Sequence, residues 1–528
     1  MPDGDKVLVI GLDGAAWNII QPMVQKGKLP TIENLMNNGC FGDLESCLPP
    51  ATFPAWKCYS TGKNPGKLGV YWFFDPDFEK NDMVVHNSTS FRSKELWDLL
   101  GENNIDCGVF NMPTTYPPKA MNGFMVSQNA PMDTKFTYPE WLEDELKLKF
   151  NYRSNPDYMF TLDRGTARRN SKQMINRRFD VAEYLMSKFN PRFCHLTLFY
   201  IDYIQHHFPQ DVVEYAWTVI DDRIGALLHR FYDERTYVIL MSDHGHIEKK
   251  CVFQIGKWLM ERRLLTLNIP GQFSQSPSQN PGLGQDDVIS TIGRMRVVRS
   301  LRPFVPAALR ARLPRLMPPE IYILHPGQLE CKEFIDWEQS TVIPVGHGSL
   351  YVNRKFVDSD QEYDDLRENL VRELEAITEP ITGTKMAKRV YRREEIYSGR
   401  YLHNAPDIVI LPNDGIFVAS SPKSEDLWYY LEQDHGWRSV HKLHGIFLVI
   451  GPDIGEGLAI HDARIYDLAP TILHILGIPI SREMDGRVLK EVFKKDSPMA
   501  KRAVEYQEVD EKARIKEKIG ELRGGGSI

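Results

Sequence analysis

Six side chains with oxygen or imidazole donors lie beside four apolar runs of the sequence: Asp13, Asp202, His206, Asp243, His244 and His441. Three carboxylates and three imidazoles are too many ligands for one tetrahedral ion, but they suit two ions. Two divalent cations about 3.5–4 Å apart can polarise a phosphoryl oxygen and stabilise the attacking and the leaving oxygen together. Any one of the six could be structural, but four strand ends that each supply ligand types are hard to obtain by chance. The pattern therefore predicts a two-metal site for phosphoryl chemistry.

Thr52 stands where a nucleophile would meet such ions. It lies between an expected strand, 41–48, and an expected helix, 55–61, whose first turn holds Pro54, a position where a missing N–H costs nothing. The unpaired N–H groups and the dipole of a helix N-terminus favour an anion. The Thr52 hydroxyl could attack phosphorus there if its pKa were lowered; the alternative is that Thr52 only caps the helix. The ligand-bearing strand ends favour the nucleophile.

The apolar runs predict an α/β fold. The run 6–12 ends in Gly-x-Asp-Gly, which is typical of a buried parallel strand that ends at the carboxyl edge of a sheet, where open α/β sheets place their sites. Asp202 and His206 are four residues apart, so one helical turn sets both on the same face. We therefore expect a central, mostly parallel sheet sandwiched by helices. Further strands or sheet-like segments are expected at 107–111, 123–127, 193–200, 237–241, 342–353, 406–411 and 446–450. Helices are expected at 31–36 (with Thr31 as its cap), 93–103, 167–189, 212–232, 361–377 and 467–476.

The composition is that of an ordinary globular protein, with 42% hydrophobic and 26% charged residues in 528. That length predicts one large α/β domain with insertions, or two to three domains. The net charge of −7 gives no reason to expect a nucleic-acid-binding surface. Seven scattered cysteines without a Cys-x-x-Cys pair fit reduced thiols. The polar N-terminus predicts no signal peptide, and no apolar run approaches the ~20 residues of a membrane span, so we expect a cytoplasmic protein without a transmembrane segment.

Two segments break the α/β pattern. Residues 265–287 are rich in Gln, Ser, Pro and Gly, which predicts an inserted loop. Residues 294–315 carry seven arginines among apolar residues; this basic cap could attract a phosphorylated substrate, lie on an anionic membrane, or be an ordinary solvated helical face. The expected division is a metal-hydrolase core at 1–264 and 339–495, a cap at 265–338 and a charged helical tail at 496–528.

Five motifs follow one another along the chain: Gly11-Leu12-Asp13-Gly14, Thr52-Phe53-Pro54 with Thr61-Gly62, Asp202 with His206, Ser242-Asp243-His244-Gly245, and Val440-His441 with Gly445-Ile446. Their order resembles that of the alkaline phosphatase superfamily. The chain most resembles the type I phosphodiesterase/nucleotide pyrophosphatase branch, over about residues 5–260 and 340–490.

The resemblance implies an alkaline phosphatase-like hydrolase with two metal ions and a covalent phospho-threonine intermediate on Thr52. It implies these ligand sets: Asp13, Asp243, His244 and Thr52 for one ion, and Asp202, His206 and His441 for the other. Mixed Asp/His ligation admits zinc, our first choice, and manganese.

The substrate-binding residues depart from that branch. Nucleotide pyrophosphatases usually carry an Asn past the nucleophile that binds a phosphate oxygen, whereas here 70–74 reads Val-Tyr-Trp-Phe-Phe. Lys57, Lys63, Asn111 or a backbone N–H could take that role. Trp72 could stack on a base or line an apolar leaving-group pocket, or it could belong to the core.

Some histidines compete for one role. His444 is the alternative to His441 as the last ligand, and we favour His441 because it stands where the family places that ligand. His206 competes in the same way with its neighbour His207. Two more histidines are interpreted as solvated or core residues, although either could line the site: His246 and His347.

The predicted substrate is a small phosphodiester or pyrophosphate, with no stable nucleic-acid complex. A phosphomonoesterase, or a phosphoglycerate mutase-like phosphotransferase, would use the same ligands. A sulfatase is disfavoured, because it would want a Cys or Ser nucleophile in a C/S-x-P-x-R context that Thr52 lacks. A catalytically silent binding protein that keeps the fold is the alternative of another class; missing ligands would have supported it, and all seven are present.

Overall fold

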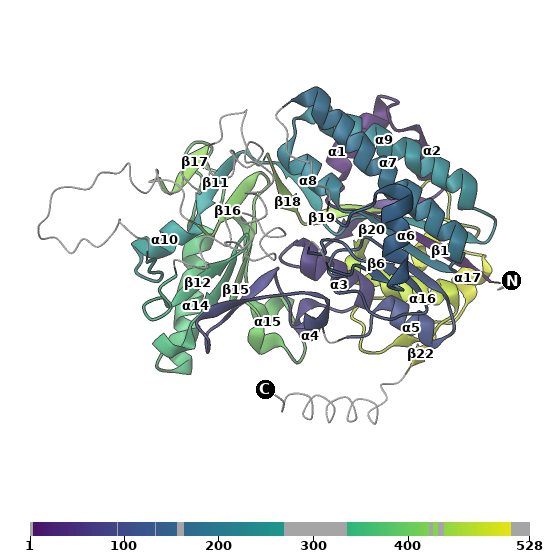
Figure 1. Cartoon of the computed structure of the whole chain (residues 1–528). Helices are drawn as coiled ribbons and strands as arrows, with labels where there is room; N and C mark the ends of the chain where they lie inside the picture. The colour runs from purple at the N-terminus through teal and green to yellow at the C-terminus, as the bar shows by residue number, and fades with distance from the viewer. Residues whose placement is uncertain are drawn as a thin grey trace, which may run out of the picture.

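The computed structural model of the chain describes residues 4–91, 93–131, 134–155, 163–268, 335–421, 426–430 and 438–507. They form a large lobe around a central sheet and a smaller lobe of mostly antiparallel strands beside it (Figure 1). The Arg-rich segment 294–315, and most of the expected loop 265–287 and of the expected tail helix 503–523, lie outside the described residues.

A nine-stranded sheet forms the centre of the large lobe, in the order β20-β2-β19-β9-β1-β8-β5-β6-β7. In that order the strands are Leu458–Arg464, Cys40–Glu45, His444–Ile450, Thr236–Met241, Lys6–Leu12, Phe193–Leu198, Cys107–Phe110, Gly123–Val126 and Thr137–Tyr138. The strands from β9 to β6 are parallel to one another, and β2 is parallel to β20. Only β19 and β7 run antiparallel to their described neighbours. The mostly parallel sheet predicted from the sequence is confirmed.

The central strands end level with one another. Gly11 of β1 pairs with Thr197 of β8 and with Met241 of β9. Because these strands are parallel, the residues that follow each of them, including Asp13 and Asp243, emerge at the same carboxyl edge of the sheet.

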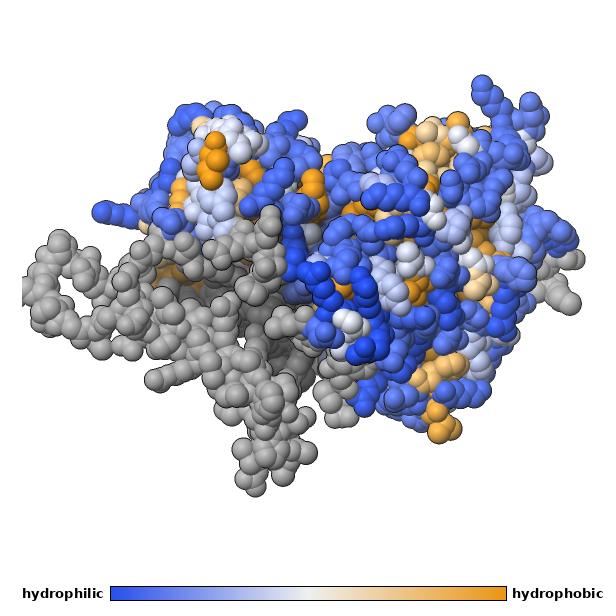
Figure 2. All heavy atoms as spheres, turned by 90° about the horizontal axis from the view of Figure 1, so that it is seen from above, coloured by the Kyte–Doolittle hydropathy of each residue, from blue (hydrophilic) through white to orange (hydrophobic). Residues whose placement is uncertain are grey.

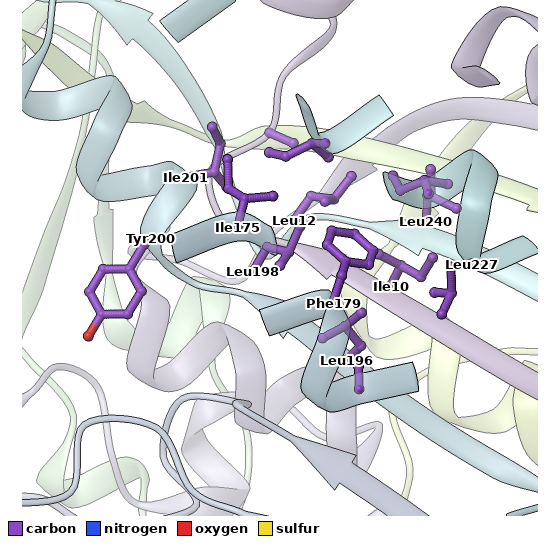
Figure 3. Packing of buried hydrophobic residues seen from close by; sticks show 14 of the residues in the cluster. Ile10, Leu12, Ile175, Phe179, Leu196, Leu198, Tyr200, Ile201, Leu227 and Leu240 are labelled. Atoms are coloured by element: carbon purple, nitrogen blue, oxygen red, sulfur yellow. The ribbon is translucent and has the colours of Figure 1, made fainter. Parts of the chain in front are cut away.

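Helices cover both faces of the sheet (Figure 1). On one face lie α1 (Trp17–Gln25), α2 (Pro30–Asn37), α6 (Trp141–Phe150), α7 (Arg164–Phe189) and α9 (Gln210–Phe231). On the other lie α3 (Thr52–Thr61), α5 (Leu96–Glu102) and α16 (Leu468–Leu476). Figure 3 shows the packing on the first face, where Phe179 of α7 lies beside Ile10 of β1 and Leu196 of β8, and Ile175 of α7 lies beside Leu12 of β1. The apolar faces of sheet and helices are thereby removed from water, which stabilises the sandwich.

Two helix starts differ from the sequence expectation. Helix α3 begins at Thr52, and the extended residue before it, Ala51, is the N-cap without a side-chain cap bond, so the interpretation of Thr52 as a mere cap is wrong. Thr31 does not cap α2 either. Instead the Asp221 carboxylate on α9 accepts hydrogen bonds from the backbone N–H groups of Thr31 (3.0 Å) and Ile32 (2.8 Å). The cap therefore comes from another helix, which local sequence does not reveal.

The smaller lobe has its own sheets and its own core. The segment expected to be sheet-like at 342–353 is a hairpin in a four-stranded antiparallel sheet of order β12-β13-β15-β14. Its strands are Val342–Val345, Ser349–Val352, Ile408–Pro412 and Ala387–Arg392. Beside it lie α10 (Ile255–Glu261), α14 (Asp360–Ala376) and the strands β16 (Ile416–Ala419), β11 (Cys251–Gln254) and β17 (Trp428–Tyr430). Ala51 and Trp72 belong to the same buried cluster as this lobe, so the chain on both sides of α3 packs against it.

The visible face of the molecule is mainly hydrophilic, with small, separate apolar patches (Figure 2). Among the described residues, the helices are all either too short or too polar to cross a bilayer.

Candidate active site

The carboxyl edge of the central sheet gathers the predicted ligands. They are Asp13 after β1, Asp243 and His244 after β9, Asp202 and His206 on α8 (Tyr200–His207), and His441 on β18 (Ser439–Lys442). Strand β18 pairs antiparallel with β10 (Gly245–Glu248), which sets His441 directly opposite His246. The donor atoms form two groups: the Thr52 cluster (Thr52, Asp13, Asp243, His244) and the Asp202 cluster (Asp202, His206, His246, His441).

The donor atoms of the Thr52 cluster converge in the buried interior of this edge. His244 Nε2 lies 3.3 Å from Thr52 Oγ1, 3.3 Å from Asp243 Oδ2 and 3.7 Å from Asp13 Oδ1. A tetrahedral zinc with ligands at about 2.0–2.1 Å separates neighbouring ligand atoms by about 3.3–3.4 Å. The four atoms therefore fit one divalent cation.

In each carboxylate of the Thr52 cluster, one oxygen accepts a hydrogen bond from the protein and the other faces the centre of the cluster. Trp56 Nε1 donates to Asp13 Oδ2 (2.9 Å), and the Gly14 N–H donates to Asp243 Oδ1 (3.1 Å). The opposite oxygens, Asp13 Oδ1 and Asp243 Oδ2, are buried without a hydrogen-bond partner. An unpaired buried carboxylate oxygen is costly unless a proton or a cation compensates it, so this pair of oxygens is the strongest observation in favour of a metal.

Burial governs protonation in the Thr52 cluster. It raises the pKa of Asp243 to about 8 and that of Asp13 well above its ordinary value, the latter with help from the charge of Asp243. It also lowers the pKa of His244 to about 4, so that this imidazole is neutral at physiological pH. Its Nδ1 faces the Gly245 carbonyl (3.2 Å), which leaves the Nε2 lone pair for a ligand.

The Asp202 cluster surrounds one carboxylate oxygen with three imidazoles. Asp202 Oδ1 lies 2.5 Å from His246 Nε2, 3.3 Å from His206 Nε2 and 3.6 Å from His441 Nε2. Two of the rings are oriented by carbonyls behind them: His206 Nδ1 faces Ser439 O (3.0 Å) and His441 Nδ1 faces Pro50 O (2.9 Å). Their Nε2 atoms therefore point inward as potential ligands.

Protonation differs in this second cluster. Burial lowers the pKa values of His206 and His441 well below the ordinary value, which leaves neutral imidazoles. Burial by itself raises the pKa of Asp202, but the histidines around it, His206 first, outweigh that effect and hold it well below the ordinary value. The cluster thus combines an ionised carboxylate with neutral imidazoles, the donor set of a zinc-type site.

Residues 7–438 match the type I phosphodiesterase/nucleotide pyrophosphatase family. The chain belongs to this family. It is therefore a hydrolase that acts on phosphoester or phosphoanhydride bonds and depends on metal, as this family does. No curated protein matches the chain.

Two solved structures of murine ectonucleotide pyrophosphatase/phosphodiesterase 5 resemble the structure of this chain. One is an inactive form in complex with AMP, 13% identical, with a TM-score of 0.50; the alignment covers 93% of this chain and 100% of that chain. The other has the same identity and coverage and a TM-score of 0.48. At this identity the likeness to the first shows the fold alone.

The structure separates the competing histidines of this hydrolase. His441 belongs to the Asp202 cluster, whereas His444 starts β19 opposite Glu45. His206 points into the cluster, whereas the ring of its neighbour His207 lies 4.2 Å from that of Tyr203.

Both lysines proposed as phosphate partners are bound to carboxylates. Lys57 Nζ is buried 2.5 Å from Glu95 Oε1, and Lys63 Nζ lies 2.7 Å from Glu483 Oε2. Breaking the buried pair would leave an uncompensated charge. The structure therefore does not bring Lys57 or Lys63 to the phosphate position as free cations.

Asn111 and Trp72 take different positions. Asn111 follows β5, at the same sheet edge as the clusters; its Oδ1 accepts a hydrogen bond from Tyr152, and its buried Nδ2 has no partner. Trp72 is buried in the core of the smaller lobe, with its ring centroid 4.9 Å from that of His347. Asn111 keeps a donor that a phosphate oxygen could use, whereas Trp72 is packed as a core residue.

His246 lies in a position that the sequence did not predict. Interpreted from the sequence as solvated or core, it is fully buried inside the Asp202 cluster. A signal was present, because residues 244 and 246 alternate and therefore share a face in an extended segment. Nothing in the sequence indicated that Ser439 contacts His246 or that Trp56 contacts Asp13, because these partners come from distant segments.

Proposed function

We propose that the protein is a two-metal phosphodiesterase or pyrophosphatase in which Thr52 is the nucleophile. The observation that carries the proposal is the convergence of Thr52 Oγ1, His244 Nε2 and two unpartnered carboxylate oxygens, Asp13 Oδ1 and Asp243 Oδ2. The remaining ligands would be those of the Asp202 cluster.

The proposed chemistry divides the work between the ions and the chain. Bound cations would supply positive charge that lowers the pKa of a nearby hydroxyl and stabilises the developing phosphoryl charge. Thr52 Oγ1 forms a new bond to phosphorus while the bond to the leaving group breaks, and water later cleaves the phospho-threonine. The N-terminus of α3, where Thr52 is the first residue, orients N–H groups and a positive dipole end toward the transferred phosphoryl group.

Zinc or manganese is proposed for both clusters, because their donors are carboxylate, imidazole and hydroxyl without sulfur. A small phosphorylated molecule is the proposed substrate. The murine neighbour in complex with AMP is described as inactive and carries a threonine-to-alanine substitution; that makes a nucleotide ester one substrate to test here. The cytoplasmic location stays a prediction. The six described cysteines are all free, buried thiols.

The test compares bis-p-nitrophenyl phosphate with p-nitrophenyl phosphate and with a nucleotide ester. We expect turnover of the diester, its loss under chelation and its return with zinc or manganese. Thr52→Ala should reduce kcat by about 10³-fold or more while two equivalents of metal stay bound, and Thr52→Ser should retain part of the activity.

The outcomes separate the alternatives. A preference for the monoester would identify a phosphomonoesterase. Two bound ions without turnover of any ester would identify a binding protein that keeps the fold. Full activity in Thr52→Ala would remove the nucleophile from the proposal, and trapping the phosphoryl group on Thr52 by mass spectrometry would support it directly.

A further inference from the structure

His246 lies inside the Asp202 cluster although the family resemblance gives it no role there. Its side chain is fully buried, and its Nε2 is one of four donor atoms that all lie within 4.8 Å of one another. The antiparallel pairing of β10 and β18 places it directly opposite His441. Two facing strands and α8 thus aim three imidazoles at Asp202.

Gly14 makes room for this ring. It has a φ of +68°, and a Cβ built on it would lie 2.4 Å from His246 Cδ2 and 3.0 Å from Asp202 Oδ1. A side chain at position 14 would therefore displace His246, and its backbone conformation favours glycine as well. The backbone after β1 is shaped around the His246 ring.

One hydroxyl group lies behind two of the imidazoles. Ser439 Oγ is 2.7 Å from His246 Nδ1, 3.0 Å from His206 Nδ1 and 3.1 Å from the Gln205 carbonyl oxygen. A serine hydroxyl has one proton to donate and lone pairs that can accept two hydrogen bonds. The direction of that single proton decides the tautomer of His246.

The end of helix α8 fixes the direction of the proton. In an α-helix the Gln205 carbonyl would accept a hydrogen bond from the N–H of residue 209, but that residue is Pro209 and has none. The N–H of Phe208 is already donated to Ile204 O (3.0 Å). Ser439 Oγ is a donor within reach of the Gln205 carbonyl (3.1 Å), and a buried carbonyl without a partner is costly.

With its proton on Gln205 O, Ser439 Oγ accepts from the Nδ1–H of His246 and shares the Nδ1–H of His206 with the Ser439 carbonyl oxygen, which lies at the same distance of 3.0 Å. Both rings then carry their lone pair on Nε2, which is the tautomer of a metal ligand whose other nitrogen is hydrogen-bonded behind it. We propose that His246 is a fourth protein ligand of the Asp202 cluster and that Ser439 is the positioning residue that orients it together with His206. This inference rests on the metal binding of the proposed function.

The alternative arrangement is a hydrogen bond. His246 Nε2 lies 2.5 Å from Asp202 Oδ1, so a proton on Nε2 would make His246 a donor that only orients Asp202. In the proposed arrangement a cation would replace that proton, and the two atoms would have to move apart to about 3.3–3.4 Å, the distance that separates two ligands of one zinc ion. Four protein ligands would then complete a tetrahedral shell, whereas the Thr52 cluster would contribute three residues and the nucleophile.

Two substitutions of His246 distinguish these arrangements. His246→Gln keeps an N–H donor close to the position of Nε2 but lacks the imidazole lone pair, and His246→Ala removes both. If His246 is a metal ligand, both variants should bind one of the two ions more than about 100-fold more weakly. Loss of a residue that only hydrogen-bonds a ligand already reduces metal affinity by about 10–100-fold. The visible spectrum of the cobalt-substituted protein should lose intensity at one site in both variants.

Ser439 and His444 supply the matched variants. Ser439→Ala should weaken one ion by about 10–100-fold, and Ser439→Thr, which keeps the hydroxyl, should restore it. His444→Ala changes a histidine on β19, outside both clusters, and should bind both ions as the wild type does. Affinities are measured with a chromophoric chelator on the full chain, and circular dichroism checks that each variant is folded.

The inference fails if His246→Gln binds both ions with wild-type affinity and an unchanged cobalt spectrum. If the variants do not fold, a structure of the wild-type protein with zinc decides, because His246 Nε2 should lie about 2.0–2.1 Å from the ion. The inference would be overturned if His246 Nε2 lay farther from the ion and donated a hydrogen bond to Asp202 instead. A wild-type protein that binds no metal would instead overturn the proposed function itself.

Discussion

The two clusters use the same sheet edge but differ in charge. The Thr52 cluster offers two carboxylates and one imidazole, and the Asp202 cluster offers one carboxylate and three imidazoles. A divalent ion in the Thr52 cluster would be neutralised by its two carboxylates. A divalent ion in the Asp202 cluster, which has one carboxylate, would keep one net positive charge. Excess positive charge beside a nucleophile attracts an anionic phosphoryl group, so we infer that the Asp202 cluster is the electrostatic partner of Thr52.

The clusters also differ in how the chain orients their donors. In the Thr52 cluster N–H groups of Trp56 and Gly14 hold the outer carboxylate oxygens. In the Asp202 cluster, carbonyls and the Ser439 hydroxyl lie behind the imidazoles. Donors therefore orient acids, and acceptors orient histidines, as second partners of metal ligands do.

The largest expected effect comes from removing one carboxylate charge from each cluster in turn. Asp13→Asn and Asp202→Asn keep the size of the side chain but weaken a ligand. We expect each variant to lose one of two metal equivalents, with an affinity loss of more than about 100-fold and a larger loss of turnover. Metal content after dialysis and diester hydrolysis are the measurements.

Asp77→Asn is the control for this pair, because Asp77 is a carboxylate of β3 (Phe74–Asp77) that contacts Lys80 and lies outside both clusters. It should keep both ions and full turnover. Loss of both ions in either cluster variant would show that the clusters do not load separately, and the comparison between them would then fail.

The second effect is a difference in pH dependence. The pKa of Asp243 is raised to about 8, and that of Asp13 is also raised, so a cation must displace protons to enter the Thr52 cluster at neutral pH. Affinity there should fall, for each proton displaced, by up to about tenfold per unit below pH 8. Asp202, whose pKa is lowered, stays ionised, so its cluster should change little between about pH 6 and 8. Chelator competition at several pH values measures both affinities.

The same shift predicts a stability change in metal-free protein. A raised carboxyl pKa means that the folded state binds a proton more tightly than the unfolded state does. That contribution is fully present below the ordinary pKa of 3.8 and is lost as pH rises through about 8. Thermal unfolding of chelated protein should therefore show falling stability over this window, and added metal should remove the fall. If the metal affinities of the Thr52 cluster and the Asp202 cluster responded equally to pH, the assignment of the raised pKa values to the Thr52 cluster would be wrong.

The elements that carry the clusters could be predicted because each has a local signature. The continuous run of β1 with its Gly-x-Asp-Gly ending, and the four-residue spacing of Asp202 and His206, were sufficient to place these residues at one sheet edge. Parallel strands end level, so local patterns were converted into a spatial prediction without any knowledge of contacts.

The supporting residues could not be predicted, because their roles depend on contacts between distant segments. Asp221 caps α2 across 190 residues of chain, and Trp56 meets Asp13 across 43. Lys57 has the sequence position of a phosphate partner, yet the fold buries it against Glu95. The place of His246 in the Asp202 cluster was not predicted for a related reason, because it depends on the pairing of β10 with β18, a strand that starts 193 residues after His246 in the chain.

The smallest expected effect tests one hydrogen bond of the Thr52 cluster. Trp56→Phe keeps most of the buried ring but removes the N–H that holds Asp13 Oδ2 at 2.9 Å. We expect the affinity of the ion at the Thr52 cluster to fall by about tenfold, with the Asp202 cluster unchanged. Metal titrations of both sites measure the difference.

Trp217→Phe is the matched control, because Trp217 is equally buried but its Nε1 has no hydrogen-bond partner. Both substitutions reduce ring volume, so both carry a similar packing cost, and only Trp56→Phe removes an interaction with a ligand. An equal loss of metal in the two variants would mean that general loosening of the core, rather than the orientation of Asp13, sets the affinity. A selective loss in Trp56→Phe would show that the protein tunes its two ions separately, through the second partner of each ligand.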